Sequence, residues 1–543
     1  MENIDSILNT DYKDSVYYLS QCRKFCKEKD WYNALKFCED GIKNDAKVVE
    51  FYQRAIVCCI KMLDGEKAVN FLSLLKQNCN DVEMVSSFQK LISDELKDVL
   101  EGMQGNNDYK NFINLKKTIL KGGGKLANMS VNLDDPNNRF IVAEEDIKTS
   151  EVIAKIPRHL TLSPSTILQT EIGKFFDNTT RNKLNSFEQD IITVFLLHEV
   201  HKGHSSEFSF LFNFLPKDYS NFPVFYQKGG VEEEILENTK FKFLIKNEKD
   251  AMEEDFKILQ ATIPFMKKTP LDDFLFMREV VASRVFSCEE DDNKSSCIMV
   301  PFCDLLNHKK YPNVIWSYDK NAKTFNLVAT NDIKSGEEIL TKYGNKGNEN
   351  LLLHYGFTLE HNVDDTYIFL LKLCNGKKGP EFLSLKIKKD IDDSETKKLF
   401  AYLRYMVTDS FIEIAKTNSL PDEVISDQEL KRYYVPSSGT NELKMLKFLG
   451  IVVDHYSVEY KTTYEEDLEF FEKNKATMST NEINCWRVRI QEKEVLKFYK
   501  DFSEYCLTLF SNRNDEVLVN SMVSKECFDV YKNYINFVFH SLR

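Results

Sequence analysis

The segment that begins PFCDLLNH and ends LLLHYGF places the narrowest limits on the fold of this chain. Between those ends it reads WSYD and then VATNDIKSGEEILTKYGNKGNEN. An apolar run ending in Asn307-His308, a turn at Gly336 and a tight bend after Tyr343 predict short strands joined by turns. Tyr343 and Tyr355 flank a short predicted helix and could point into one pocket. Two interpretations remain open here: an active site, or polar residues that are satisfied within a core.

Strand and helix patterns alternate on either side of this segment. FIVAEEDIKTSEVIAKIP reads as two β-rich runs joined by a polar turn, and FEQDIITVFLLHEV has a helical apolar stripe. Residues 230–287 continue as helix, and the alternation of Phe325, Leu327 and Ala329 predicts a strand. The chain after about residue 370 is mostly helical and rich in charge. These patterns predict a strand–helix–strand sandwich between two helical ends.

The first hundred residues repeat themselves. KDWYNALKFCEDGI and LDGEKAVNFLSLL share an Asp, an Ala and a Phe at a spacing of 34 residues, the period of tetratricopeptide (TPR) repeats. A small Ala at such a position lets two helices pack closely. The pairs are Asp30 and Asp64, Ala34 and Ala68, and Phe37 and Phe71. We expect a TPR-like helical region, and the alternative is an unrelated helical bundle whose spacing coincides.

Taken in order, these motifs resemble the SET-domain methyltransferases. The resemblance is to the branch that contains the Rubisco large-subunit methyltransferase and the actin-histidine methyltransferase. It rests on DLLNH, NDIKSGEEI, the YG bend and NxxLLLHYGF, with RFIVAEEDIKTSEVIAKIP, FLFNFLPKDYSNFPVFY and TPLDDFLFMREVVASRVF upstream. Downstream, NELKMLKF, TTYEEDLEFF and INCWRVRIQEKEVLKFY resemble the substrate-binding domain of the Rubisco enzyme. The resemblance covers about residues 110–510.

Together with the N-terminal repeat, the resemblance implies an α+β chain with three parts. Residues 1–100 form the TPR-like helical region. Residues 101–365 form a SET-domain β-fold with an inserted helical subdomain at about 166–290. Residues 366–543 form an all-α Rubisco-methyltransferase-type substrate-binding domain.

The same resemblance implies a reaction and a set of site residues. The reaction is methyl transfer from S-adenosyl-L-methionine to a protein side chain. Tyr343 matches the catalytic tyrosine of the family, and Tyr355 matches a second position in the channel that admits the substrate side chain. The positions matched to cofactor binding are Asn138, Arg139, Arg284, Asp304, Asn307, His308, Tyr355 and Phe357.

One loop departs from the family pattern. The family carries Gly-x-Gly where the backbone approaches the methionine part of the cofactor. Aligning the strand that follows places Asn138 and Phe140 at those two positions, with Arg139 between them. Asn tolerates left-handed dihedral angles, whereas a Phe140 side chain would narrow the groove. We therefore expect contact through backbone groups of Asn138 and Arg139. The alternative is a catalytically weak SET/TPR interaction scaffold.

Two channel positions bear on which nitrogen is methylated. The histidine-methylating relative has Asn two residues after the cofactor-contacting Arg and a bulky Trp just before the Asp, where this chain has Phe286 and Cys303. An imidazole facing Phe286 would leave a buried polar group unmet, whereas a lysine presents only methylenes there. We therefore expect a protein-lysine N-methyltransferase, with histidine as the alternative acceptor.

Composition limits the partners and the compartment. The 543 residues carry 72 Lys and Arg against 85 Asp and Glu, a net charge of −13, which disfavours nucleic acid and anionic membranes and suits a basic, lysine-containing protein substrate. A protein partner on the TPR-like helices is a further expectation. The acidic start of the chain has no signal-peptide pattern, so we expect a cytoplasmic or nuclear protein with reduced thiols. Neither CxxC nor HExxH occurs, and we expect no metal.

Overall fold

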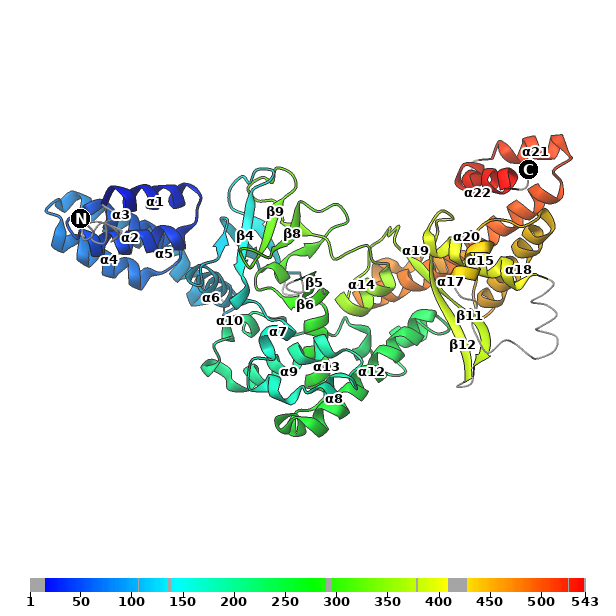
Figure 1. Ribbon diagram of the computed structural model, residues 1–543, viewed down its shortest axis with the longest axis horizontal. Coiled ribbons are helices and arrows are strands. Elements are labelled where there is room, and N and C mark those ends of the chain that lie inside the picture. Colours follow the sequence, from blue (N-terminus) through cyan, green and yellow to red (C-terminus); the bar gives the residue numbers. More distant parts are fainter. Residues whose placement is uncertain are drawn as a thin grey trace, which may run out of the picture. The chain divides into compact units, whose positions relative to one another are not determined.

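A computed structural model describes residues 15–105, 107–134, 138–289, 295–376, 379–408, 427–525 and 527–541 of the chain. The chain divides into two compact units, which are described in turn (Figure 1). The first unit comprises Met1–Lys217 and Met252–Gly344, and the second comprises Asp218–Ala251 and Asn345–Arg543.

The described part of the first unit begins with six helices. They are α1 (Ser15–Lys27), α2 (Trp31–Asn44), α3 (Val49–Lys61), α4 (Gly65–Asn78), α5 (Val82–Gly105) and α6 (Asn107–Lys121). Asp30 caps the N-terminus of α2 and Asp64 caps that of α4, each by accepting a backbone N–H three residues later. Ala34 and Ala68 are fully buried at equivalent places in these two helices. The predicted N-terminal helical region is confirmed, while its TPR character stays a prediction. The predicted boundary after residue 100 falls inside α5.

The strands of the first unit form one larger sheet and three strand pairs. The four-stranded antiparallel sheet has the order β1-β4-β9-β8, and the pairs are β2–β3, β5–β6 and the parallel pair β7–β10. Phe325, Leu327 and Ala329 are all buried on one face of β9, as the alternation predicts. The strands are β1 (Lys125–Leu126), β2 (Met129–Asn132), β3 (Phe140–Ala143), β4 (Val152–Pro157), β5 (Val285–Glu289), β6 (Ser295–Met299), β7 (Asn307–His308), β8 (Val314–Asp319), β9 (Thr324–Ala329) and β10 (Leu340–Thr341).

Helices are inserted between β4 and β5. Within the first unit, α9 and α13 pack together, and the Arg278 guanidinium on α13 pairs with the buried Asp190 carboxylate on α9 at 3.1 Å. Phe286, which the periodicity places at the end of a helical stretch, lies in strand β5 instead. The inserted α-helices are α7 (Pro164–Ile167), α8 (Asn178–Arg181), α9 (Phe187–Lys202), α10 (Ser209–Phe212), α11 (Val231–Ile235), α12 (Lys240–Thr262) and α13 (Leu271–Ala282).

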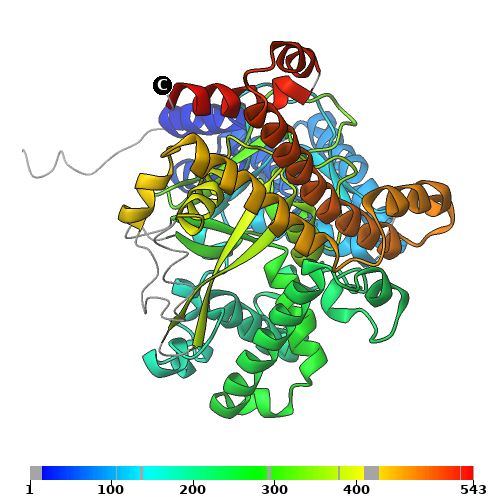
Figure 2. The same ribbon diagram turned by 90° about the vertical axis from the view of Figure 1, so that its right-hand side faces the viewer.

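The second unit is mainly helical, but it contains a long hairpin that corrects the expectation of an all-α C-terminal region. Strands β11 (Thr366–Gly376) and β12 (Gly379–Lys388) pair antiparallel, next to α20 and α15 respectively (Figures 1 and 2). In β12, Leu385 and Ile387 are buried while Ser384 and Lys386 are exposed, so side chains alternate between the two faces. The charge-rich composition of the whole tail hid this local alternation.

The helices of the second unit have clear sequence signals at their N-termini. Ser479 and Glu482 form a reciprocal capping box at the start of the 32-residue α20, and Thr463 and Glu466 form another at α19. These caps satisfy backbone N–H groups that have no intrahelical acceptor. Besides α11 and the first part of α12, the α-helices described in this unit are α14 (Asn348–Tyr355), α15 (Ser394–Met406), α17 (Asp427–Leu430), α18 (Gly439–Ser457), α19 (Tyr464–Asn474), α20 (Thr480–Ser511), α21 (Glu516–Val523) and α22 (Cys527–Ser541).

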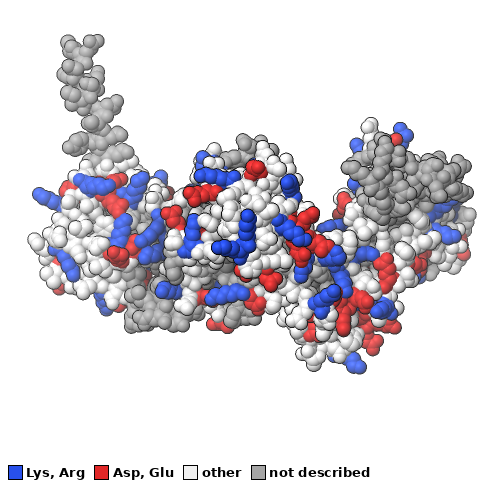
Figure 3. All heavy atoms as spheres, turned by 90° about the horizontal axis from the view of Figure 1, so that it is seen from below, with Lys and Arg blue, Asp and Glu red and all other residues white. Residues whose placement is uncertain are grey.

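The surface carries both signs of charge. On the face in Figure 3, Lys and Arg side chains are interspersed with Asp and Glu. Among the described residues, no helix has the length and apolar content needed to span a bilayer.

Candidate functional site

The parallel pair β7–β10 is the centre of the candidate site. Its register places Leu340 opposite Asn307 and Thr341 opposite His308. The chain then continues to Tyr343, whose backbone N–H donates to His308 Nδ1 at 3.1 Å. The His308 and Tyr343 rings lie 5.2 Å apart, centroid to centroid. Two predicted site residues 35 positions apart in the sequence are therefore in direct contact.

The phenol of Tyr343 is held by the backbone. Its Oη donates to the Leu306 carbonyl oxygen at 2.8 Å, just before β7. Gly344 follows with a φ of 111°, a left-handed conformation that favours glycine and turns the chain directly after the tyrosine. A phenol oxygen that donates its hydrogen in this way can also accept hydrogen bonds through its lone pairs.

The Asn307 side chain joins three segments. Its Nδ2 donates to Glu338 Oε1 at 3.0 Å, to Asn138 Oδ1 at 3.3 Å and to the Arg139 carbonyl oxygen at 3.4 Å. The departing loop at residues 138–139 is thus fastened to the predicted Asn-His pair. Glu338 was not predicted as a site residue, because nothing in GEEI distinguishes it from an ordinary surface carboxylate.

Arg284 and Asp304 form a mostly buried pair beside these segments. Arg284 Nη1 donates to the Asp304 carbonyl oxygen at 2.7 Å and lies 3.4 Å from Asp304 Oδ2. The two side chains are only 14% and 5% exposed. Burial raises the pKa of the Asp304 carboxyl group, and the Arg284 charge opposes that rise. Two residues that the sequence assigns to cofactor binding, Arg284 and Asp304, are therefore in direct contact.

The turn before Asp304 contains a strained residue. Phe302 is fully buried with a φ of 71°, a conformation that non-glycine residues rarely adopt. Its ring stacks on Phe112 of α6 at 6.1 Å. Packing therefore holds the backbone that directs Cys303 and Asp304. No local sequence signal predicts a left-handed phenylalanine.

The loop that the sequence resemblance aligns with Gly-x-Gly leads into an ordinary strand, β3. Phe140 pairs with Asn132 in β3, and its extended backbone does not require glycine. Its half-buried side chain lies on the face opposite the buried Ile141. The Arg139 guanidinium turns toward Phe214, donating to its carbonyl oxygen at 3.2 Å and lying 4.8 Å from its ring centroid.

The two predicted channel residues have apolar surroundings. The Phe286 ring lies 5.0 Å from the Phe325 centroid and 5.7 Å from that of Trp316. Cys303 is 1% exposed, and burial raises the pKa of its thiol well above the ordinary value. The hydroxyl of Thr341, also buried, has no hydrogen-bond partner among the described residues.

Tyr355 and Phe357 belong to the second unit. Tyr355 ends α14, its ring lies 6.5 Å from that of Phe357, and Lys346 Nζ lies 5.8 Å from its centroid. Burial raises the pKa of Tyr355 to about 12 and lowers the pKa of the Lys346 amine. Gly356, between the two rings, has a φ of 74°, and Asn221 Nδ2 donates to its carbonyl oxygen at 2.9 Å.

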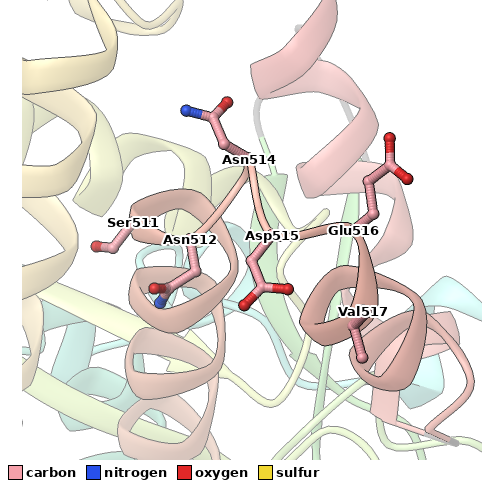
Figure 4. A pocket seen from close by; sticks show the side chains of 6 residues that line it. All are labelled: Ser511, Asn512, Asn514, Asp515, Glu516 and Val517. Atoms are coloured by element: carbon pink, nitrogen blue, oxygen red, sulfur yellow. The ribbon is translucent and has the colours of Figure 1, made fainter.

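A surface hollow elsewhere offers no comparable chemistry. It lies at the turn between α20 and α21, and all of its lining side chains are exposed (Figure 4). Asp515 in this turn serves as the N-cap of α21. None of the predicted site residues lines it. Among the described residues, no group of three or more His, Cys, Asp or Glu side chains is arranged to hold a metal ion.

Comparisons with known proteins identify the class. Residues 138–344 match the SET domain family, and residues 367–496 match the family described as Rubisco LSMT substrate-binding. A crystal structure of the SET domain of LSMT bound to lysine and AdoHcy superposes with a TM-score of 0.60 at 18% identity, covering 78% of this chain and 99% of that one. A structure of Rubisco LSMT bound to AdoMet gives a TM-score of 0.56 at 19% identity, with coverages of 75% and 95%. The chain is a SET-domain protein.

Curated relatives narrow the class further. The Rubisco large subunit N-methyltransferase of Nicotiana tabacum is 24% identical over 403 residues, covering 67% of this chain and 76% of the relative. The aldolase-lysine N-methyltransferase of Arabidopsis thaliana is 25% identical over 391 residues, with the same coverages. The actin-histidine N-methyltransferase of Gallus gallus is 22% identical over 420 residues, covering 72% and 68%. The chain therefore contains a SET domain followed by a Rubisco-LSMT-type substrate-binding domain, and its relatives include Rubisco large-subunit and actin-histidine methyltransferases, as the sequence motifs predict.

Proposed function

We propose that this chain is an S-adenosylmethionine-dependent protein-lysine N-methyltransferase that acts on a non-histone protein. The observation that carries the proposal is the phenol of Tyr343, oriented by the Leu306 carbonyl and packed on His308 within a SET domain. A substrate-binding domain follows in the chain, as in the methyltransferases that are its relatives.

The residues around β7 fit the cofactor. Asn307, the Arg284–Asp304 pair and the backbone at Asn138 and Arg139 supply amide, guanidinium and carbonyl groups for its polar parts. The extended backbone at Phe140 and the unpartnered Thr341 hydroxyl are compatible with a polar ligand. Phe357 would cover the adenine. The bound cofactor supplies a methyl group on a sulfonium, which a neutral amine can attack.

The chain's own groups prepare the amine. A free lysine has a pKa of about 10.4, so the amine must lose a proton before it attacks. An apolar channel beside a positive charge disfavours the ammonium form and lowers that pKa. The phenol oxygen of Tyr343 accepts a hydrogen bond from the amine. This hydrogen bond directs the lone pair of the amine nitrogen toward the methyl group. Tyr355 would form a second wall of the channel.

Lysine is the acceptor that the channel residues favour. Phe286 packs among Trp316 and Phe325, so it presents an aromatic surface without a hydrogen-bond partner for an imidazole nitrogen. The small Cys303 leaves room for a long side chain. Because actin-histidine methyltransferases are relatives of similar identity, histidine is the second candidate acceptor.

The partner and the compartment are further proposals. The net charge of −13 favours a basic segment of the target, and the TPR-like helices would bind a protein partner. The described cysteines are all free thiols, which suits the cytoplasm or nucleus.

The test is to incubate the protein with methyl-labelled S-adenosylmethionine and a cell lysate, and to identify the labelled residue by mass spectrometry. Methyl-lysine supports the proposal, and methyl-histidine supports the second candidate. Absence of label, together with no calorimetric binding at millimolar cofactor, would favour the interaction scaffold.

A further inference from the structure

Four thiols that the proposed function does not use converge in the N-terminal helices. Cys22 and Cys26 lie on α1, Cys38 lies on α2 and Cys58 lies on α3. Cys22, Cys38 and Cys58 are fully buried, whereas Cys26 is half-buried. Three helices therefore bring their sulfur atoms to one place.

One pair of these sulfur atoms is unusually close. Cys22 Sγ lies 2.9 Å from Cys38 Sγ and 4.0 Å from Cys26 Sγ. The shorter distance falls between the roughly 2.05 Å of a disulfide bond and the roughly 3.5–4.0 Å of ordinary contacts between carbon atoms. Cys26 and Cys38 together with burial raise the pKa of the Cys58 thiol well above its ordinary value. Of these two pairs, Cys22 and Cys38 need the smaller movement to become bonded.

Cys26 is the thiol through which an oxidant can enter. It is the most exposed of the four, and it lies one residue before the end of α1 at Lys27. Hydrogen bonds from Cys22 and Cys58, together with the nearby Arg54 guanidinium, lower the pKa of its thiol. A thiolate is the nucleophilic form of cysteine, and reactivity follows thiolate character and exposure.

A metal site is the competing explanation for clustered cysteines. A tetrahedral thiolate site places its sulfur atoms at equal distances from one ion. Here one separation is 2.9 Å and another is 4.0 Å, and no metal-holding arrangement occurs among the described residues. The unequal spacing favours a redox pair.

We propose that Cys22 and Cys38 form a reversible disulfide, made when a peroxide oxidises the cluster through Cys26. The Cys26 thiolate attacks the peroxide, the O–O bond breaks, and a sulfenic acid forms while the released hydroxide takes up a proton to become water. The Cys22 thiol attacks the sulfenic sulfur, and a second water leaves. Attack of Cys38 on the Cys22 sulfur moves the bond to Cys22–Cys38 and returns Cys26 as a thiolate. Two thiols lose two hydrogens, and hydrogen peroxide becomes two waters.

The disulfide would join α1 to α2 across the first helical hairpin. A cross-link between these positions restricts the unfolded chain and so stabilises the hairpin. A low-molecular-weight dithiol would reverse it. This inference does not depend on methyl transfer, because its product is detected in the protein itself.

Tryptic mapping of the full chain after treatment with hydrogen peroxide tests the proposal. Cleavage at Arg23 and Lys24 separates Cys22 from Cys26, so each thiol of the cluster lies in its own peptide. The expected product links residues 14–23 to residues 37–43, with loss of two hydrogens and reversal by dithiothreitol. A map without this link, or with other links only, overturns the proposal, as does stoichiometric zinc in protein purified without chelator.

Variants distinguish the role of Cys26 in the oxidation from the roles of Cys22 and Cys38 in the final disulfide. Cys22→Ala and Cys38→Ala should each abolish the link, whereas the control Cys79→Ala, a half-buried thiol beside Met84 in the same helical region, should retain it. Cys26→Ala should slow formation of the link by about tenfold or more without changing which peptides are joined. If the Cys22–Cys38 link forms at an unchanged rate in Cys26→Ala, the proposed entry of the oxidant through Cys26 is wrong. This measurement tests the proposal even if the variants of the buried Cys22 and Cys38 fail to fold.

Discussion

Replacing Tyr343 by Phe removes a single oxygen atom from the candidate site. The change deletes the 2.8 Å hydrogen bond from Tyr343 Oη to the Leu306 carbonyl. It leaves the ring contact with His308 and the backbone hydrogen bond to His308 Nδ1, because neither involves the phenol oxygen. One such hydrogen bond contributes about 0.5–1.5 kcal/mol to stability, so the variant should remain folded.

The effect on methyl transfer should be much larger. A polar group that acts on the reacting centre typically contributes roughly 2.7–4 kcal/mol, or about 100- to 1000-fold in rate. Single-turnover transfer from saturating labelled cofactor measures this loss, and calorimetry should give a cofactor affinity within about twofold of the parent. The matched control is Tyr311→Phe, which changes a tyrosine that is 80% exposed and should leave the rate unchanged. A Tyr343→Phe protein that turns over like the parent would refute the assignment.

Four further outcomes are expected. Deleting residues 1–105, which removes α1–α5 and keeps α6, should leave cofactor affinity unchanged by calorimetry; a folded fragment without binding would place part of the cofactor site in those helices. Gly356→Ala should lower the melting temperature, because its φ is 74° and a Cβ there would collide with the Asn221 amide; an unchanged melting curve would contradict this. Burial raises the pKa of Glu492 to about 7, so the contribution of this carboxyl group to the free energy of unfolding is full below about pH 4.3 and declines as the pH rises toward 7. In Glu492→Gln the urea midpoint of unfolding should no longer fall over this pH range, and a midpoint that falls in parallel with the parent would contradict this. Matched basic peptides with one Lys or one His should show faster methylation of the Lys peptide, and the reverse order would favour histidine.

The sequence could predict those site residues whose contacts follow from strand ends and turns. Asn307, His308 and Tyr343 sit at such places, and the structure brings them together through β7 and β10. Glu338 and Phe302 could not be found in this way. Glu338 takes part in the site because it accepts a hydrogen bond from Asn307, which lies on a segment distant in the sequence. The backbone of Phe302 is held by the packing of its ring on Phe112.

The fold shows the same division between local and tertiary causes. A Ser or Thr with a Glu three residues later signals the start of a helix, as at Ser479 and Thr463. The β11–β12 hairpin does not, because its alternating residues are embedded in a charged, mostly helical tail. Phe286 was placed in a helix because the apolar run of α13 leads directly into β5.

The hydrogen bond between Asn138 and Asn307 constrains how this protein can change over time. The sequence resemblance aligns Asn138 with a glycine of the family, and the Asn138 side-chain oxygen accepts a hydrogen bond from Asn307, which we propose to bind the cofactor. Asn138→Gly alone would remove that acceptor and leave the Arg139 carbonyl oxygen as the acceptor of Asn307 in this loop, while position 140 would still be Phe. The effect of a substitution at position 138 therefore depends on which residues stand at positions 140 and 307. Because Asn138 and Asn307 are in contact, we expect substitutions at these two positions to be non-additive, so the order in which they occur decides which intermediates keep the hydrogen bond.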